Sequence, residues 1–214
     1  MAHTILIGCD QGYYDQWATN LLRSINKYAP WVKLHCHVVN PRDLAELPYV
    51  IYSTEEFKDP PLGYLEAVRF KVAHELYPND ELIILDADCI CRRPFSQGDF
   101  DQLHQQGTTI LRNMKNMRWL AGFVCPGNTA FLARLHQQLM SKPCEEWQSY
   151  WDQNCIKSVL KDMVACELSP SWLRWNKIGK DDDPVFYTIK GKDHKQEAKY
   201  RKYYDQALEA LDAR

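Results

Sequence analysis

Hydrophobic and polar positions at the start of the chain follow a strand period, then a helix period, then a strand period again. Residues 5–8 form a short apolar run with β-branched side chains, which predicts a buried strand. Apolar residues at helical spacing predict a helix over 15–28, which Ala29-Pro30 ends. Alternation over 34–39 predicts a second strand. This order is typical of a parallel sheet with covered faces.

The strongest strand signal is the run Leu-Ile-Ile-Leu at 82–85, which is apolar on both faces, as a central parallel strand should be. A helical pattern over 63–76 precedes it. Further strands are predicted at 108–111, 122–125 and 185–189, and further helices at 129–140, 152–163 and, with many charges, about 195–213. We expect segment 171–184 to be a mobile loop. The pattern predicts one α/β domain over 1–214, with a mostly parallel central sheet flanked by helices.

Composition narrows the class of protein. The 214 residues are 45% hydrophobic and 25% charged, as in soluble globular proteins, and the formal net charge of −2 argues against a globally basic nucleic-acid binder. No apolar run approaches the ~18 residues that span a bilayer. The first residues lack the basic and apolar regions of a signal peptide, so we expect a cytoplasmic protein whose eight cysteines are reduced.

Two carboxylates, Asp86 and Asp88, follow the central strand directly. Charges are costly at the end of an apolar strand unless a cation joins them, and ligands bind at the carboxyl ends of strands in open α/β sheets. Hard divalent cations take such oxygen ligands together with phosphate oxygens. The pattern therefore predicts a metal–diphosphate site. The alternative is a polar strand end whose carboxylates pair with Arg92 or Arg93.

Leu85-Asp86-Ala87-Asp88, preceded by Arg69-Phe70, resembles the core motif of nucleotide-diphospho-sugar glycosyltransferases with the Rossmann-like GT-A fold, especially family 8 members of bacterial and phage type. Other segments resemble that family in the same order: Asp10, Tyr13 and Tyr14, then 35–41, 119–123, 151–153 and 190–195. The resemblance implies a UDP-sugar donor, a Mn²⁺ or Mg²⁺ cofactor and retention of anomeric configuration. It makes Asp10, Tyr13 and Tyr14 the pocket for the nucleotide base or ribose.

The resemblance also assigns roles near the reacting bond. Asp86 and Asp88 become metal ligands, while Asp152 and Gln153 face the donor sugar. Arg69 either clamps a phosphate or pairs with Asp86 or with the sugar-contacting aspartate. From the residues alone, Asp152 is equally well interpreted as a helix N-cap. The closing segment is predicted to hold the diphosphate and metal through Gly191, Lys192, Lys195 and His194.

Two positions depart from the family pattern. Thr188 stands where the family has a metal-binding histidine, and Leu120 stands where it has a sugar-contacting asparagine. They keep open a non-catalytic sugar-nucleotide or glycan-binding module. A nucleotidyltransferase is a third alternative, although the loop at 8–12 has no Lys or Arg to hold a triphosphate.

The acceptor is expected to be a glycan hydroxyl. A modified DNA base is a second acceptor class, suggested by six basic residues between 190 and 202, which could equally form a solvated helix face. His35 and His37 are interpreted as strand residues with satisfied hydrogen bonds rather than as metal ligands.

Overall fold

The computed structural model of the chain describes residues 2–113, 118–176, 178–179, 182–189 and 197–213. Its seven-stranded sheet has the order β3-β2-β1-β4-β7-β6-β8. In chain order these strands are β1 (His3–Asp10), β2 (Lys33–Val39), β3 (Val50–Glu55), β4 (Glu81–Leu85), β6 (Thr109–Asn113), β7 (Arg118–Cys125) and β8 (Cys166–Glu167). Among these strands only β7 runs against the others, so the sheet is mostly parallel, as predicted.

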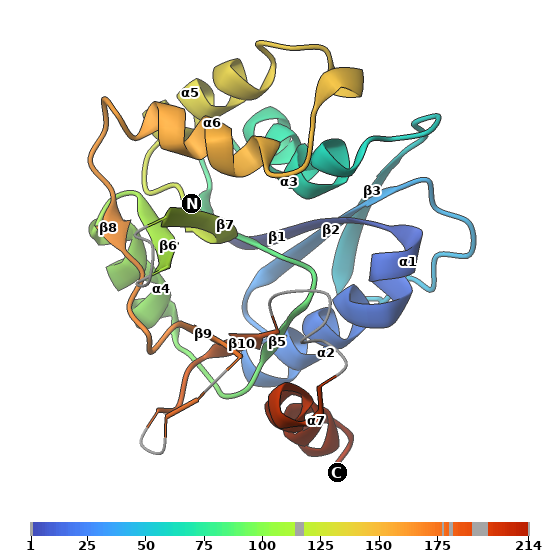
Figure 1. Cartoon of the computed structure of the whole chain (residues 1–214). Coiled ribbons are helices and arrows are strands. Elements are labelled where there is room, and N and C mark those ends of the chain that lie inside the picture. Colours follow the sequence, from blue (N-terminus) through green and yellow to red (C-terminus); the bar gives the residue numbers. More distant parts are fainter. Residues whose placement is uncertain (1, 114–117, 177, 180–181, 190–196, 214) are drawn as a thin grey trace.

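Helices cover both faces of this sheet (Figure 1). On one face lie α3 (Leu62–Leu76), α5 (Thr129–Leu139) and α6 (Trp151–Val159). The other face packs against α2 (Thr19–Tyr28), α4 (Gln97–Gln105) and a small three-stranded sheet. Side chains alternate between the two faces along β1. Leu6 packs in the core under α3, α5 and α6, whereas Ile5 and Ile7 pack in the core on the side of α2 and α4.

The small sheet has the order β5-β10-β9, with β5 (Cys89–Cys91), β9 (Leu173–Trp175) and β10 (Phe186–Thr188). The C-terminal helix α7 (Ala198–Asp212) packs on it through Tyr204, beside Trp17. Short elements complete the chain: α1 (Gln11–Tyr13), a π-helical turn at Tyr14–Ala18 and a 3-10 turn at Cys144–Glu146.

Most predicted elements are confirmed, but β5, β8 and α4 were not predicted, and three further corrections are needed. Strand β3 was not predicted, because it is an edge strand without a clean alternation of buried and exposed residues. The predicted loop at 171–184 contains β9, which pairs with β10 in parallel. The helix predicted over 152–163 ends at Val159. All eight cysteines are free thiols, as predicted. None of the helices in the described ranges combines the length and apolar character needed to cross a membrane.

His35 and His37 are buried strand residues with hydrogen-bond partners, as predicted. Both rings contact the Ser53 hydroxyl, at 2.7 and 2.8 Å, and the Tyr77 hydroxyl contacts the other nitrogen of His35 at 2.7 Å. His37 Nε2 also lies 3.3 Å from a carboxylate oxygen of Glu55. These contacts connect β2 to its neighbours.

Helix α3 crosses β1 unusually closely at Gly8. A Cβ atom at this position would lie 2.9 Å from Cβ and 3.1 Å from Cα of Arg69, closer than side chains normally pack. Both contacts are to the helix itself or to the root of its side chain, so neither can move aside alone. Glycine at position 8 therefore fixes how deeply Arg69 enters the fold.

We expect Gly8→Ala to lower the free energy of unfolding by about 1 to 3 kcal/mol, because the added methyl group forces α3 away from β1. Gly12→Ala is the matched control: its Cβ would meet nothing closer than a carboxylate oxygen of Asp10 at 3.6 Å, so its effect should stay within about 0.5 kcal/mol. Urea unfolding of both variants measures the difference. Equal free energies of unfolding for the two variants would show that the close approach of Gly8 to Arg69 does not affect stability.

Candidate active site

The carboxyl end of β4 leads into a tight turn that carries Asp86 and Asp88. The Asp86 amide donates to the Gly122 carbonyl of β7 at 3.1 Å, and the Cys89 amide donates back to the Asp86 carbonyl at 3.3 Å. The chain thus leaves the central sheet at Asp86 and enters the small sheet at Cys89. Asp88 is buried, whereas the Asp86 side chain keeps 20% of its surface exposed. Both predicted metal ligands therefore lie at the sheet edge where ligands bind in this architecture.

Arg69 links this turn to α6. Its Nη2 atom lies 2.7 Å from Oδ1 of Asp86, 3.4 Å from Oδ2 of Asp152 and 3.2 Å from the Ala121 carbonyl oxygen. The Nη1 atom donates to the Glu66 carbonyl, while Nε is buried without a hydrogen-bond partner among the described residues. Arg69 is 4% exposed, which favours the predicted pairing with the two aspartates over a phosphate clamp.

Asp152 is the second residue of α6 and is not its N-cap. The N-cap residue is Tyr150, which adopts a left-handed backbone with φ of 65° and supplies no side-chain cap. Oδ1 of Asp152 instead accepts from the neighbouring Gln153 amide at 2.6 Å. The capping interpretation was therefore wrong, since the carboxylate is 2% exposed and directed at Arg69.

Helix α3 also positions the segment before α6. The Glu66 carboxylate accepts from the Tyr150 amide at 2.7 Å and from the Ser149 hydroxyl at 3.2 Å. A Cβ atom at Gly63 would lie 2.0 Å from the Gln148 carbonyl oxygen, so only glycine allows this segment to cross α3. Sequence reasoning missed both residues. The sequence signal that could have identified Glu66 is its position three residues before Arg69, which places both on the same face of the helix.

Burial raises the pKa of Asp152 to about 7, against the lowering effect of Arg69, and the nearby charge of Asp86 raises it further. One guanidinium thus faces two carboxylates, and the second carboxylate carries a proton over part of the neutral range. A pKa near neutrality allows Asp152 to bind or release a proton at working pH.

Thr188 lies directly beside the Asp-x-Asp turn. Its hydroxyl donates to Oδ1 of Asp88 at 2.9 Å, and both residues are buried. The contact arises because β10 pairs antiparallel with β5, with Thr188 opposite Cys89. The position where the family has a histidine is therefore adjacent to Asp88, and in this chain it supplies a hydroxyl group. Leu120, the other departure, packs against the core.

The three residues predicted to form a nucleotide pocket, Asp10, Tyr13 and Tyr14, differ in exposure and contacts. Asp10 is the N-cap of α1, accepting from the Tyr13 amide at 2.7 Å, and Tyr13 keeps 42% of its surface exposed. Tyr14 was wrongly placed in the pocket: it is 1% exposed, its hydroxyl donates to the Ala45 carbonyl, and it contacts the Tyr52 hydroxyl at 2.9 Å. With its ring in the core, Tyr14 has no face to offer a base.

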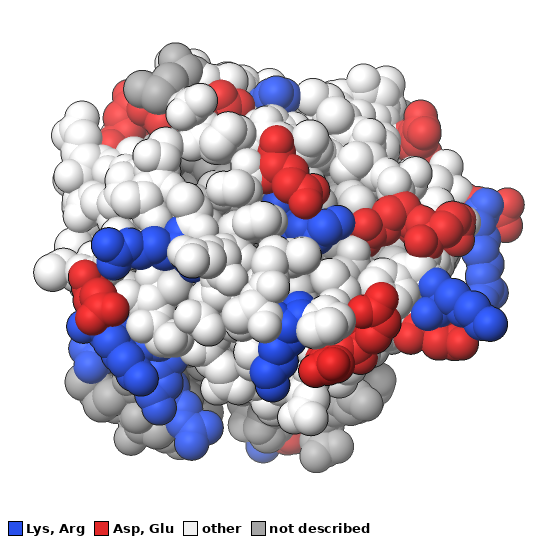
Figure 2. All heavy atoms as spheres, turned by 90° about the horizontal axis from the view of Figure 1, so that it is seen from above, with Lys and Arg blue, Asp and Glu red and all other residues white. Residues whose placement is uncertain are grey.

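Gly191, Lys192, Lys195 and His194 lie outside the described residues. On the described part of the basic tail, Lys199 pairs with Glu197 at 2.7 Å and Arg201 with Asp205 at 3.0 Å. These local pairs favour a solvated helix face. On the face seen in Figure 2, basic and acidic side chains are interspersed rather than gathered by sign. A polyanion such as DNA is bound by a field of one sign, which the face on the α5 and α6 side does not present in Figure 2.

We expect Asp152→Asn to change how stability depends on pH. The folded-state pKa of about 7 lies above the ordinary value of 3.8, so the native protein binds the proton more tightly than the unfolded chain and loses stability as pH rises from about 4 to about 7. Asparagine mimics the protonated carboxyl. Relative to wild type, the variant should therefore gain about 2 to 4 kcal/mol between pH 4 and pH 8. Urea unfolding across this range measures the gain, and parallel pH profiles would contradict the assignment.

Comparisons with solved structures agree on the fold. The chain is similar to the apo form of the glycosyltransferase GlyE of Streptococcus pneumoniae TIGR4 (TM-score 0.67, 13% identity) and to the bifunctional glycosyltransferase WbbM (TM-score 0.67, 14% identity). In both cases 99% of this chain is covered, but only 62% and 50% of those chains. Galactosyltransferase LgtC, solved with donor and acceptor sugar analogues, gives a TM-score of 0.64 at 13% identity and is covered over 97% of its length, against 99% of this chain.

No protein-family model and no curated protein matches the sequence. At these identities the similarity concerns the fold. The chain therefore has the α/β architecture of GT-A glycosyltransferases, with a seven-stranded, mostly parallel sheet between helices.

Proposed function

We propose that the chain is a metal-dependent glycosyltransferase that moves a sugar from a nucleotide-diphosphate donor, UDP-linked, to a glycan hydroxyl. The observation that carries this proposal is the convergence of Asp86 and Asp152, from β4 and α6, on one buried arginine. The fold shared with GlyE, WbbM and LgtC supports sugar transfer over the other chemistries that α/β sheets perform.

Asp86 and Asp88 are the proposed ligands of Mn²⁺ or Mg²⁺. The donor set suits these ions, because hard cations prefer carboxylate oxygens and complete their coordination with phosphate oxygens. The charge balance of the site also suits a cation. Arg69 is the one positive charge that faces the carboxylates of Asp86 and Asp152, and burial makes the second negative charge costly. When bound, the metal supplies positive charge to the departing diphosphate.

The chain's own residues have separate roles in this proposal. Arg69 is a positioning residue that fixes the carboxylates of Asp86 and Asp152. Gln153, half-buried beside Asp152, is proposed to contact the donor sugar. One solved form of LgtC is an active-site mutant in which glutamate replaces a glutamine, which supports giving a glutamine this role. His194, Lys192 and Lys195 remain proposed ligands of the metal and diphosphate.

Asp152 is proposed to adjust the charge beneath the sugar by binding a proton, rather than to reach the reacting carbon from its buried position. Its pKa near 7 supports this role. Retention of anomeric configuration rests on the family resemblance alone. The acceptor is proposed to be a glycan, because the described charges form local pairs instead of a continuous basic surface.

Donor turnover tests the proposal. Incubation with a panel of UDP-sugars and Mn²⁺ should release UDP, and EDTA should abolish the release. Asp88→Asn should lower turnover at least about 100-fold, because removing one group that stabilises a developing charge costs about 3 kcal/mol or more. Glu145→Gln, on the turn before α6, is the control and should keep full turnover.

The alternatives make different predictions in the same assay. A non-catalytic module would bind UDP-sugars without releasing UDP, and a nucleotidyltransferase would consume a nucleoside triphosphate and release pyrophosphate. Turnover that persists in EDTA would contradict the metal role of Asp86 and Asp88.

Asp10 is proposed to contact the nucleotide in addition to capping α1, and two substitutions separate these roles. Asp10→Asn keeps the cap, because asparagine caps a helix about as well as aspartate, but it removes the charge. We expect this variant to keep its melting temperature and to bind UDP about 10-fold more weakly, as measured by calorimetry. Asp10→Ala should lose both stability and affinity. Unchanged UDP affinity in Asp10→Asn would leave only the capping role.

A further inference from the structure

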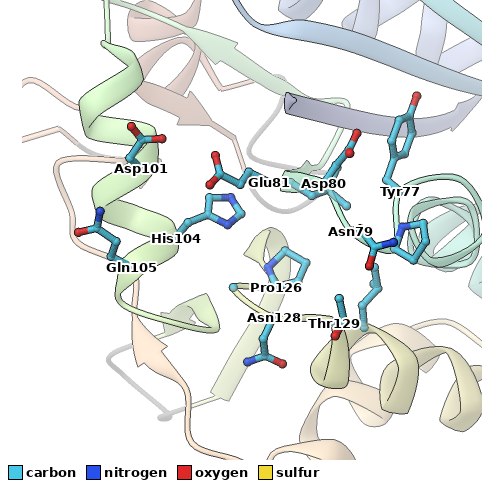
Figure 3. A pocket seen from close by; sticks show the side chains of 14 residues that line it. Tyr77, Asn79, Asp80, Glu81, Asp101, His104, Gln105, Pro126, Asn128 and Thr129 are labelled. Atoms are coloured by element: carbon cyan, nitrogen blue, oxygen red, sulfur yellow. The ribbon is translucent and has the colours of Figure 1, made fainter. Parts of the chain in front are cut away.

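Three potential metal ligands meet at the amino end of the central sheet, the end opposite Asp86. His3 begins β1, Glu81 begins β4 and Asp101 lies on α4. Nε2 of His3 lies 2.9 Å from Oε2 of Glu81 and 2.6 Å from Oδ1 of Asp101. Figure 3 shows the Glu81 and Asp101 carboxylates turned toward each other at the edge of a cavity of about 480 Å³. Within the described ranges, this is the one group of three such residues whose ligand atoms all lie within 4.8 Å of one another.

Hydrogen bonds alone do not account for two carboxylates that both approach one imidazole nitrogen. Nε2 of an imidazole carries at most one proton, so it can donate one full hydrogen bond, yet two carboxylate oxygens lie within reach of it. A neutral histidine would leave two negative charges side by side. A divalent cation would balance both charges and allow the imidazole nitrogen to act as a lone-pair donor.

The ligands are held in place before any ion binds. The His3 ring makes edge contacts with Trp31 and Phe100, at centroid distances of 5.4 and 5.0 Å. His3 and Glu81 are paired neighbours in the parallel β1–β4 ladder. Asp101 lies one residue after Phe100 on α4, so the same packing that seats the ring also positions the carboxylate.

We propose that His3, Glu81 and Asp101 form a second metal site, for a borderline divalent cation of the Zn²⁺ class. One nitrogen and two carboxylate oxygens suit Zn²⁺ or Co²⁺, whereas Mg²⁺ and Ca²⁺ favour all-oxygen sites. A tetrahedral ion with bonds of ~2.0 Å separates its ligand atoms by roughly 3.3 Å. The three side chains would open by about half an ångström to admit it, and the exposed fractions of 20%, 25% and 44% leave room for that movement.

The surroundings favour a cation. The cavity lets an ion reach the cluster from solvent, and the carboxylate of Asp80 adds a further negative charge to its lining. His104 lines the same cavity as Glu81 and Asp101. The five residues of β4 separate this site from Asp86 by about 16 Å, so the two sites bind independently. An occupied site would join β1, β4 and α4 and stabilise the fold.

Thermal unfolding with added Zn²⁺ tests the proposal. At a hundredfold excess over the dissociation constant, Zn²⁺ should raise the melting temperature by about 5 °C or more, whereas Mg²⁺ should not. Glu145→Gln, on the 3-10 turn before α6 and outside both proposed metal sites, should respond like wild type. Asp101→Asn and His3→Gln should not respond, and Asp101→Asn is the safer variant because its side chain is the most exposed of the three.

Co²⁺ provides a second readout that does not depend on stability. Bound tetrahedrally, it should give a visible absorption band with wild-type protein that Asp101→Asn lacks. His136→Ala controls for the stacked His74–His136 pair, whose ring centroids lie 4.1 Å apart, and should keep the band. Equal Zn²⁺ responses in wild type and Asp101→Asn, or no response in wild type, would overturn the proposal.

Discussion

One buried guanidinium, that of Arg69, joins the three elements on which the candidate active site rests. Such an ion pair contributes little net stability, but removing one partner leaves an uncompensated buried charge and costs about 3 to 5 kcal/mol. The placement of Arg69 depends in turn on two glycines. Gly8 lets α3 approach β1, and Gly63 lets the segment before α6 cross α3. These two close approaches place α3 so that Arg69 reaches both Asp86 and Asp152.

The electrostatics of the site follow from this placement. Burial would make two ionised carboxylates too costly beside one arginine, and the pKa of Asp152 is accordingly raised. The Thr188 hydroxyl adds a neutral donor to Asp88 instead of a further charged or metal-binding group. The described site thus carries two carboxylates and one guanidinium, and the raised pKa of Asp152 reduces the excess negative charge near neutral pH.

The sequence predicted those features that local patterns encode. The apolar run at 82–85 placed Asp86 and Asp88 at the end of a central strand, whereas for Arg69 the sequence left a phosphate clamp and pairing with an aspartate as alternatives. The prediction for Tyr14 was wrong because the sequence around an aromatic residue beside a loop is the same whether its ring stacks on a ligand or packs in the core. Asp152 is not a helix cap, because α6 begins one residue before it and its carboxylate faces Arg69, which lies 83 positions away in the chain. Contacts of that kind, like those of His3 with Glu81 and Asp101, depend on topology and leave no local signal.

The turn at Asp86–Asp88 is also the joint between the two sheets, because β4 belongs to one and β5 to the other. Any rotation of the small sheet against the large one must bend the chain at these residues. The chain also passes between the sheets from β5 to β6 and from β8 to β9, but only the crossing at Asp86–Asp88 carries the candidate metal ligands. A ligand bound by both carboxylates would therefore sit where the two sheets meet, next to the Thr188 hydroxyl that already links β10 to Asp88.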